Sequence, residues 1–150
     1  SLEQYTIHAG RSIPNIWSIG GFSLSENTAY ACEPFVTTEQ GGGFVRNGKI
    51  KNIFAINSRK KTKNDEADKL LNFIWENFNM LPFALRWITK EWEEKEAKEL
   101  LDILIKKKAV QAYPVLIEVN EQRVAQAEHT FIPGESGVTV TTKALSQYNE

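Results

Sequence analysis

The spacing of apolar residues changes twice along this chain, and this change restricts the folds open to it. Before residue 60 and after residue 112, β-forming residues alternate with polar ones and are punctuated by Gly and Pro, as in strands and loops. Between these limits the apolar residues recur every three or four positions, which is typical of amphipathic helices. The pattern predicts helices over about 64–78, 81–88 and 91–108. We therefore expect an α/β (α+β) chain with a three-helix insert at about 60–112.

The predicted helices have well-defined ends. Asn64 is suited to cap the first helix, and Asp65 and Glu66 follow in its first turn, where the helix dipole favours negative charge. Glutamates crowd the start of the third helix, and Lys106, Lys107 and Lys108 lie at its end. This arrangement agrees with the dipole at both ends.

Composition describes an ordinary globular chain. Its 150 residues suit one domain, 41% are hydrophobic and 25% charged, and the net charge of −1 gives no general attraction to nucleic acid or anionic membrane. The single Cys32 excludes an internal disulfide and a cysteine-based zinc site. With a single cysteine we expect a reducing, cytoplasmic setting, and no apolar run of roughly 18 residues and no signal peptide is visible. The chain opens on Ser1 without an initiator Met, which suggests processing or a piece of a longer protein.

A hairpin is predicted after the third helix, from residues 113–119 and 123–132 across Asn120 and Glu121, with a last strand at 138–142. Three helices followed by a hairpin also describe a winged-helix module, which raises a nucleic-acid alternative. Between Arg59 and Val110, 12 Lys/Arg face 10 Asp/Glu, a net charge of only +2 with no basic stripe on a helix. This near balance argues against specific nucleic-acid binding.

Two glutamates on predicted strands are the candidates for chemistry. Glu33 lies in the strand at 28–35 and shares a face with Ala29, Ala31 and Phe35. Glu128 lies in the strand at 124–132, on a face that is ordinary if wet but requires a partner for the carboxylate if covered. Two such carboxylates can bridge divalent cations. The only aspartates lie on the predicted helices, so the residues alone indicate half of a metal site.

The Gly41–Gly43 run resembles a phosphate-binding loop only superficially. It lacks the Lys-Ser/Thr of a P-loop and the spacing of a GxGxxG motif, so it is interpreted as a flexible turn.

Five motifs in order resemble the type II methionine aminopeptidases, especially the archaeal members. They are YTIHAG at residues 5–10, YACEPF at 30–35, LPFALRW at 81–87, YPVL at 113–116 and AQAEHT at 125–130. The resemblance spans nearly the whole chain. It implies the C-terminal half of a pita-bread fold, in which the helical segment at about 60–112 is the insert that marks the type II subgroup.

The resemblance also implies roles for individual residues. Glu33 and Glu128 would ligate two divalent ions (Co, Mn, Fe or Zn), and Glu33 would also serve in catalysis. His8 would contact the scissile amide and help to stabilise the tetrahedral intermediate, while Ile7 and Tyr113 would line an apolar methionine pocket. His129 is interpreted as structural.

The family's remaining ligands, two aspartates and a histidine, lie upstream of the HAG motif and are not in this chain. We therefore expect the chain alone to be inactive, with the missing N-terminal half as its partner and N-terminal Met peptides of nascent proteins as substrates. No membrane partner and no specific nucleic acid are expected. The alternative from another class is a non-catalytic pita-bread relative that binds ribosome or RNA.

Overall fold

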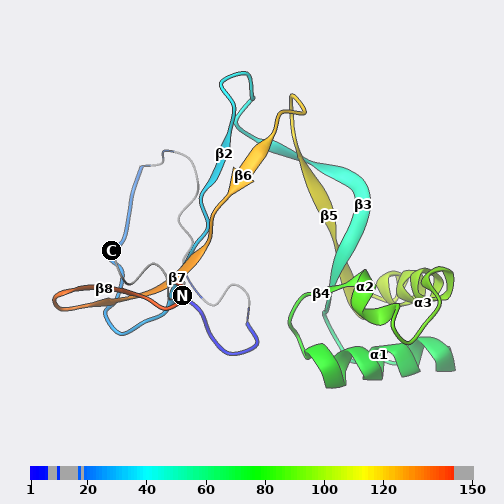
Figure 1. The fold of residues 1–150 in the computed structure, drawn as a ribbon. Coiled ribbons are helices and arrows are strands. Elements are labelled where there is room, and N and C mark those ends of the chain that lie inside the picture. The colour runs from blue at the N-terminus through cyan, green and yellow to red at the C-terminus, as the bar shows by residue number, and fades with distance from the viewer. Residues whose placement is uncertain (7–9, 11–16, 18, 144–150) are drawn as a thin grey trace. The chain divides into compact units, whose positions relative to one another are not determined.

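The computed structural model describes residues 1–6, 10, 17 and 19–143, and its elements are shown in Figure 1. The chain divides into two compact units: Val45–Ile117, called here the helical unit, and Ser1–Phe44 with Glu118–Glu150, called the strand unit. Residues Ile7 and His8 lie outside the described residues. No helix within the described residues is long and apolar enough to cross a membrane.

The helical unit contains a three-stranded sheet in the order β4-β3-β5 and three helices. Its strands are β3 (Val45–Ile56), β4 (Phe83–Ala84) and β5 (Val110–Glu118), and its helices are α1 (Asp65–Phe78), α2 (Leu85–Ile88) and α3 (Glu94–Lys106). Strand β5 ends on Glu118, the first residue of the second segment of the strand unit. Gly48 of β3 lies so close to β5 that a Cβ atom there would come within 2.8 Å of the Val115 carbonyl oxygen.

The buried apolar core lies in the helical unit. Helices α1 and α3 pack against each other. The face that each helix buries is formed by apolar residues three and four positions apart. The largest fully buried side chains all belong to this unit: Phe83, Leu70, Ile74, Ile88, Leu101, Leu104 and Val110. Stacking of Phe83 on Phe54 and on Phe78 joins the sheet to α1.

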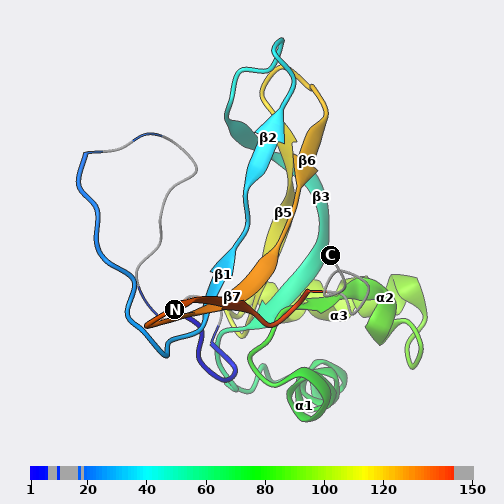
Figure 2. The ribbon, with the colours of Figure 1, turned by 60° about the vertical axis from the view of Figure 1, so that its left-hand side comes forward.

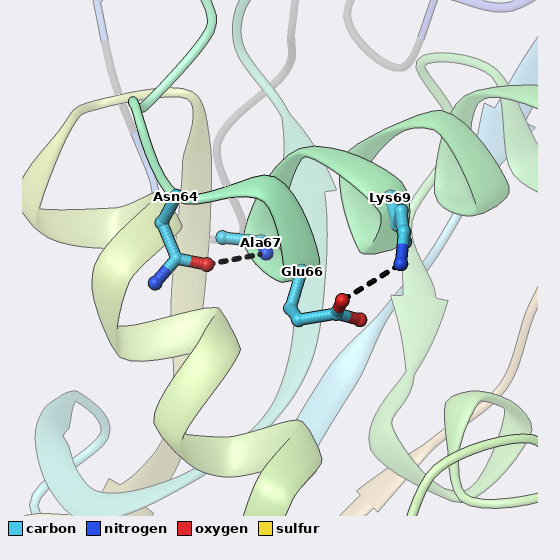
Figure 3. A network of polar contacts seen from close by, with 4 residues as sticks. All are labelled: Asn64, Glu66, Ala67 and Lys69. Atoms are coloured by element: carbon cyan, nitrogen blue, oxygen red, sulfur yellow. Dashed lines mark hydrogen bonds and ion pairs between the residues drawn. The ribbon is translucent and has the colours of Figure 1, made fainter.

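The start of α1 is fixed by its own sequence (Figure 3). The Asn64 side-chain oxygen accepts a hydrogen bond from the Ala67 amide at 2.9 Å, and Lys69 pairs with Glu66 at 2.7 Å. An N-cap of this kind satisfies an amide that has no partner within the helix. The predicted helix start is therefore confirmed.

The strand unit contains two small sheets. Strands β1 (Tyr30–Cys32), β7 (His129–Gly134) and β8 (Gly137–Val140) form one in the order β1-β7-β8, and β2 (Phe35–Thr37) pairs with β6 (Val124–Gln126) in the other. All three pairings are antiparallel, and Figures 1 and 2 show β2 beside β6 in each view.

Three expectations from the sequence differ from the structure. The predicted strands at 28–35 and 124–132 are each broken in two, at Glu33–Pro34 and at Ala127–Glu128. The second helix is shorter than predicted, because Phe83 and Ala84 pair with β3 before the helix starts. The hairpin prediction is wrong, since β5 pairs with β3 and β6 pairs with β2, two partners that are distant in sequence.

Candidate metal centre

A break separates the antiparallel pairing of β1 with β7 from that of β2 with β6, and Glu33 and Glu128 lie at this break. On one side of the interruption Cys32 lies opposite His129, and on the other side Phe35 lies opposite Gln126. The register is the same on both sides, so Glu33 lies opposite Glu128. The Ala127 amide donates to the Pro34 carbonyl at 3.3 Å within the interruption, in agreement with this register.

Residues that are directly opposite on an antiparallel pair have Cβ atoms about 4.5–5.5 Å apart in a regular ladder, and like charges in that position repel. Both glutamates are exposed in this chain. The Gln126 side-chain amide donates to Glu33 at 3.4 Å, which is a long hydrogen bond. A divalent cation would offset the repulsion between the two carboxylates.

Carboxylate oxygens suit hard divalent cations, so the chemistry of this pair fits part of a metal site. Within the described residues, however, no group of three or more His, Cys, Asp or Glu is placed to hold a metal ion. By itself the glutamate pair can attract a cation, but it does not form a closed metal site.

The other candidate residues are distributed between the two units. Tyr113 is half-buried in β5 of the helical unit, and its hydroxyl accepts a hydrogen bond from the Gln111 side chain. His129 lies at the start of β7 and its ring contacts the Thr142 hydroxyl at 3.1 Å, while the same hydroxyl accepts from the Thr130 amide at 2.9 Å. Ile7 and His8 lie outside the described residues.

Glu118 is a buried carboxylate that sequence reasoning missed. It is 3% exposed, and its carboxylate accepts hydrogen bonds from the amides of Gly42 at 2.6 Å, Asn120 at 2.7 Å and Gln122 at 3.2 Å. Burial by itself raises the pKa of this carboxyl, but the amides of Gln122, Asn120, Gly42 and Gly43 together outweigh it and hold the pKa below the usual 4.5.

Because the three amides come from two separate turns, Glu118 ties the Gly41–Gly43 loop to the turn after β5. A side chain at Gly42 would collide with Val119, since a Cβ there would lie 2.3 Å from a Val119 methyl carbon. The glycine run is therefore a turn packed around a carboxylate, and the prediction of a turn is confirmed. The sequence indicates the role of Glu118 only if two features are taken together. One is a Glu inside an apolar strand, and the other is a glycine run 76 residues away.

The fold is similar to that of a solved structure. A thermophilic Arx1 superimposes with a TM-score of 0.64 at 18% sequence identity, over 80% of this chain and 32% of that one. The chain thus has the mixed α/β architecture of the pita-bread class of proteins. No protein-family model matches the chain.

Sequence comparison identifies the family. The chain is 37% identical over 147 residues to the methionine aminopeptidase of Saccharolobus solfataricus, covering 96% of this chain and 48% of that protein. The corresponding enzymes of Methanocaldococcus jannaschii (37% over 142 residues) and Thermococcus kodakarensis (38% over 142 residues) match over 95% and 94% of the chain. The chain spans about half the length of these curated relatives. It belongs to the methionine aminopeptidase family as a partial-length homologue.

Proposed function

We propose that this chain supplies the C-terminal half of the active site of a dinuclear-metal methionine aminopeptidase, a hydrolase that removes the N-terminal methionine from nascent proteins. The observation that supports the proposal most directly is the position of Glu33 opposite Glu128 across a broken ladder. Two carboxylates in that position repel each other without a cation between them. Homology to archaeal enzymes of this name over nearly the whole chain supports the same assignment.

Glu33 and Glu128 would hold two divalent ions, with Co, Mn, Fe and Zn as candidates. Such ions, when bound, polarise a carbonyl and lower the pKa of water enough to provide hydroxide near neutral pH. Of the two carboxylates, Glu33 would pass a proton to the leaving amine.

The remaining candidate residues would bind the substrate. His8 would contact the scissile amide and help to stabilise the tetrahedral intermediate. Ile7 and Tyr113 would line an apolar pocket for the unbranched thioether of methionine. The helical segment at about 60–112 would be the insert of the type II subgroup, and the protein would work in the cytoplasm.

The proposal requires a second half that carries the two aspartates and the histidine, on the same or a separate chain. Its first test is an assay of the isolated 150 residues with Co(II) or Mn(II) on a peptide that begins Met-Ala. We expect no turnover, because two carboxylates are too few to hold two ions. Appreciable cleavage by this chain alone would contradict the division of the site.

The second test uses the protein reassembled with the half that carries the upstream ligands. We expect two bound metal ions by elemental analysis, and the loss of metal in Glu128→Gln. Glu135→Gln, which removes an exposed carboxylate outside the pair, is the matched control and should keep both ions. Two metals retained at full occupancy in Glu128→Gln would refute the assignment.

The alternative function is that of a non-catalytic pita-bread protein that binds ribosome or RNA. The similarity to Arx1, at 18% identity, concerns the fold alone and does not decide between the two. The presence of both glutamates that the resemblance assigns as metal ligands favours the enzyme. Ligands of the Asp, Asp and His types in the upstream half would support the enzyme, and their absence would support the alternative.

A further inference from the structure

The nearly neutral net charge of this chain conceals two units of opposite charge. The helical unit carries 15 Lys/Arg and 10 Asp/Glu, a net charge of +5. The strand unit carries 3 Lys/Arg and 9 Asp/Glu, a net charge of −6. The sum is the −1 of the whole chain. Attraction to a polyanion therefore has to be judged for the helical unit by itself.

Seven basic residues of the helical unit lie in or next to two turns that lie side by side. The turn between β3 and α1 is tied to the turn between α3 and β5, since the amides of Asn57 and Ser58 donate to the Ala109 carbonyl at 2.8 and 3.1 Å. We call these seven residues the basic corner, and all of them are exposed: Arg59, Lys60, Lys61, Lys63, Lys106, Lys107 and Lys108.

The helix dipole accounts for only part of the basic corner. Lys106–Lys108 lie at the C-terminal end of α3, where positive charge is favoured. Arg59, Lys60, Lys61 and Lys63 instead precede the N-terminal end of α1, where positive charge is disfavoured. The dipole of α1 therefore does not account for these four residues.

Two lysines of the corner also occupy backbone conformations that favour glycine. Lys63 has φ of 69° and Lys108 has φ of 57°, both in the left-handed region. Lys108 closes α3 in the manner of a Schellman motif, with its amide bonded to the Ile105 carbonyl and the Ala109 amide bonded to the Leu104 carbonyl, each at 2.9 Å. Glycine is the usual residue at this position of a helix end. Lys108 therefore places a positive charge where the backbone conformation disfavours any side chain.

Four acidic residues lie close to the corner in the chain, so its seven positive charges are partly offset: Asp65, Glu66, Asp68 and Asp102. Asp68 accepts from the Thr62 amide at 2.8 Å and from the Thr62 hydroxyl at 2.9 Å. Glu66 pairs with Lys69, as Figure 3 shows. The Arg59 guanidinium lies 4.8 Å from the centre of the Trp75 ring, which orients it without neutralising its charge.

We propose that the basic corner binds the phosphate backbone of a double-stranded nucleic acid, independently of base sequence. Phosphates that recur along a duplex match clustered cations from two adjacent turns. No large apolar side chain that the structure describes is exposed at residues 57–63 or 106–109, so the corner offers no wedge for a membrane and no stacking platform for unpaired bases. This function adds to the proposed peptidase activity and does not depend on it.

The test is fluorescence anisotropy of the 150-residue chain with a 20-base-pair duplex of arbitrary sequence, in separate RNA and DNA arms. If each of the seven cations neutralises one phosphate, the slope of log K against log salt is about −6. Lys63→Gly with Lys108→Gly should reduce its magnitude by about 2 and weaken binding about ten-fold or more at 100 mM salt. Both changes place glycine where the backbone favours it, so the variant should melt no lower than the parent.

The matched control is Lys90→Gln with Lys95→Gln, which removes the same charge elsewhere in the unit. Lys95 lies at the opposite end of α3, about 16 Å from Lys106 at the rise of an α-helix. The control should bind within about two-fold of the parent, apart from a small effect of net charge. Lys60→Gln with Lys61→Gln is a second corner variant, which tests binding if the glycine variant misfolds.

Three results would overturn the proposal. One is the absence of parent binding to both duplexes at 50 mM salt. Another is an equal loss of duplex affinity in the corner and control variants, which would show that only the net charge of the chain matters. The third is a preference for phosphatidylserine vesicles or polyglutamate over either duplex. Peptide cleavage is not a readout, so failure here and failure of the peptidase assignment are distinguishable.

Discussion

At the scale of single residues, local sequence patterns reveal some of the important side chains and miss others. Glu33 and Glu128 were found because each stands in a recognisable motif on a strand-like segment. Glu118 stands between Ile117 and Val119 in an apolar run and resembles an outward-facing strand residue. Its role depends on the amide of Gly42, which is 76 residues distant, and no single-sequence pattern contains that pairing.

Replacing Glu118 by Gln should loosen the glycine loop in a pH-dependent way. The pKa of Glu118 is lowered in the folded chain, so its contribution to stability is present above the unfolded pKa and is lost as pH falls through the folded value. We expect lower amide-exchange protection at Gly42, Asn120 and Gln122 in Glu118→Gln at pH 7. The difference from the parent should shrink below pH 4.5.

Glu39→Gln is the control for this experiment, because Glu39 is exposed. It should leave the three amides as protected as in the parent. An equal deficit of Glu118→Gln at pH 7 and at low pH would mean that the carboxylate charge is not what holds the loop.

At the scale of elements, helices were predicted better than strands. The start of α1 depends on Asn64 and its neighbours in the next turn, all within a few residues of each other. The two-residue β4 and the partners of β5 and β6 depend on strands elsewhere in the chain. Because pairing partners are set by tertiary structure, the sequence indicated a hairpin across Asn120 and Glu121 that does not form.

The cap of α1 gives an element-scale prediction. Asn64→Ala removes the acceptor for the Ala67 amide and should lower the free energy of unfolding by about 1 kcal/mol. Asn72→Ala makes the same chemical change at an exposed position within α1, where alanine is the better helix former, and should raise it by about 0.5 kcal/mol. Urea unfolding followed by circular dichroism measures both. Equal effects of the two substitutions would show that the cap contributes nothing.

The whole molecule combines a unit that has an apolar core with a unit whose described residues bury no apolar side chain. Every buried apolar side chain that the structure describes belongs to the helical unit, from Phe54 to Val110. The described part of the strand unit buries only the carboxylate of Glu118 and exposes apolar residues such as Val36, Val124 and Val138. Burial of apolar surface is the main favourable term in folding, so the two units should differ in local stability.

Limited digestion with thermolysin, which cleaves beside apolar residues, tests this difference. We expect the first cuts in the strand unit, at exposed sites such as Val36 and Val124, and a resistant fragment that contains Val45–Ile117. The urea-denatured chain should be cut in both units at similar rates. First cuts within α1 or α3 of the native chain would contradict the assignment of the stable core.

The hydrogen bonds of Glu118 have a consequence for Glu33 and Glu128, the two proposed metal ligands. A shift of one residue between β2 and β6 would place Glu33 opposite Ala127 and turn the two carboxylates to different faces of the ladder. The glycine loop follows β2 and the turn that holds Glu118 precedes β6, so the bonds from Glu118 clamp the far end of the same two strands. Without touching either residue, this clamp would set the strand alignment on which the spacing between Glu33 and Glu128, the two proposed metal ligands, depends.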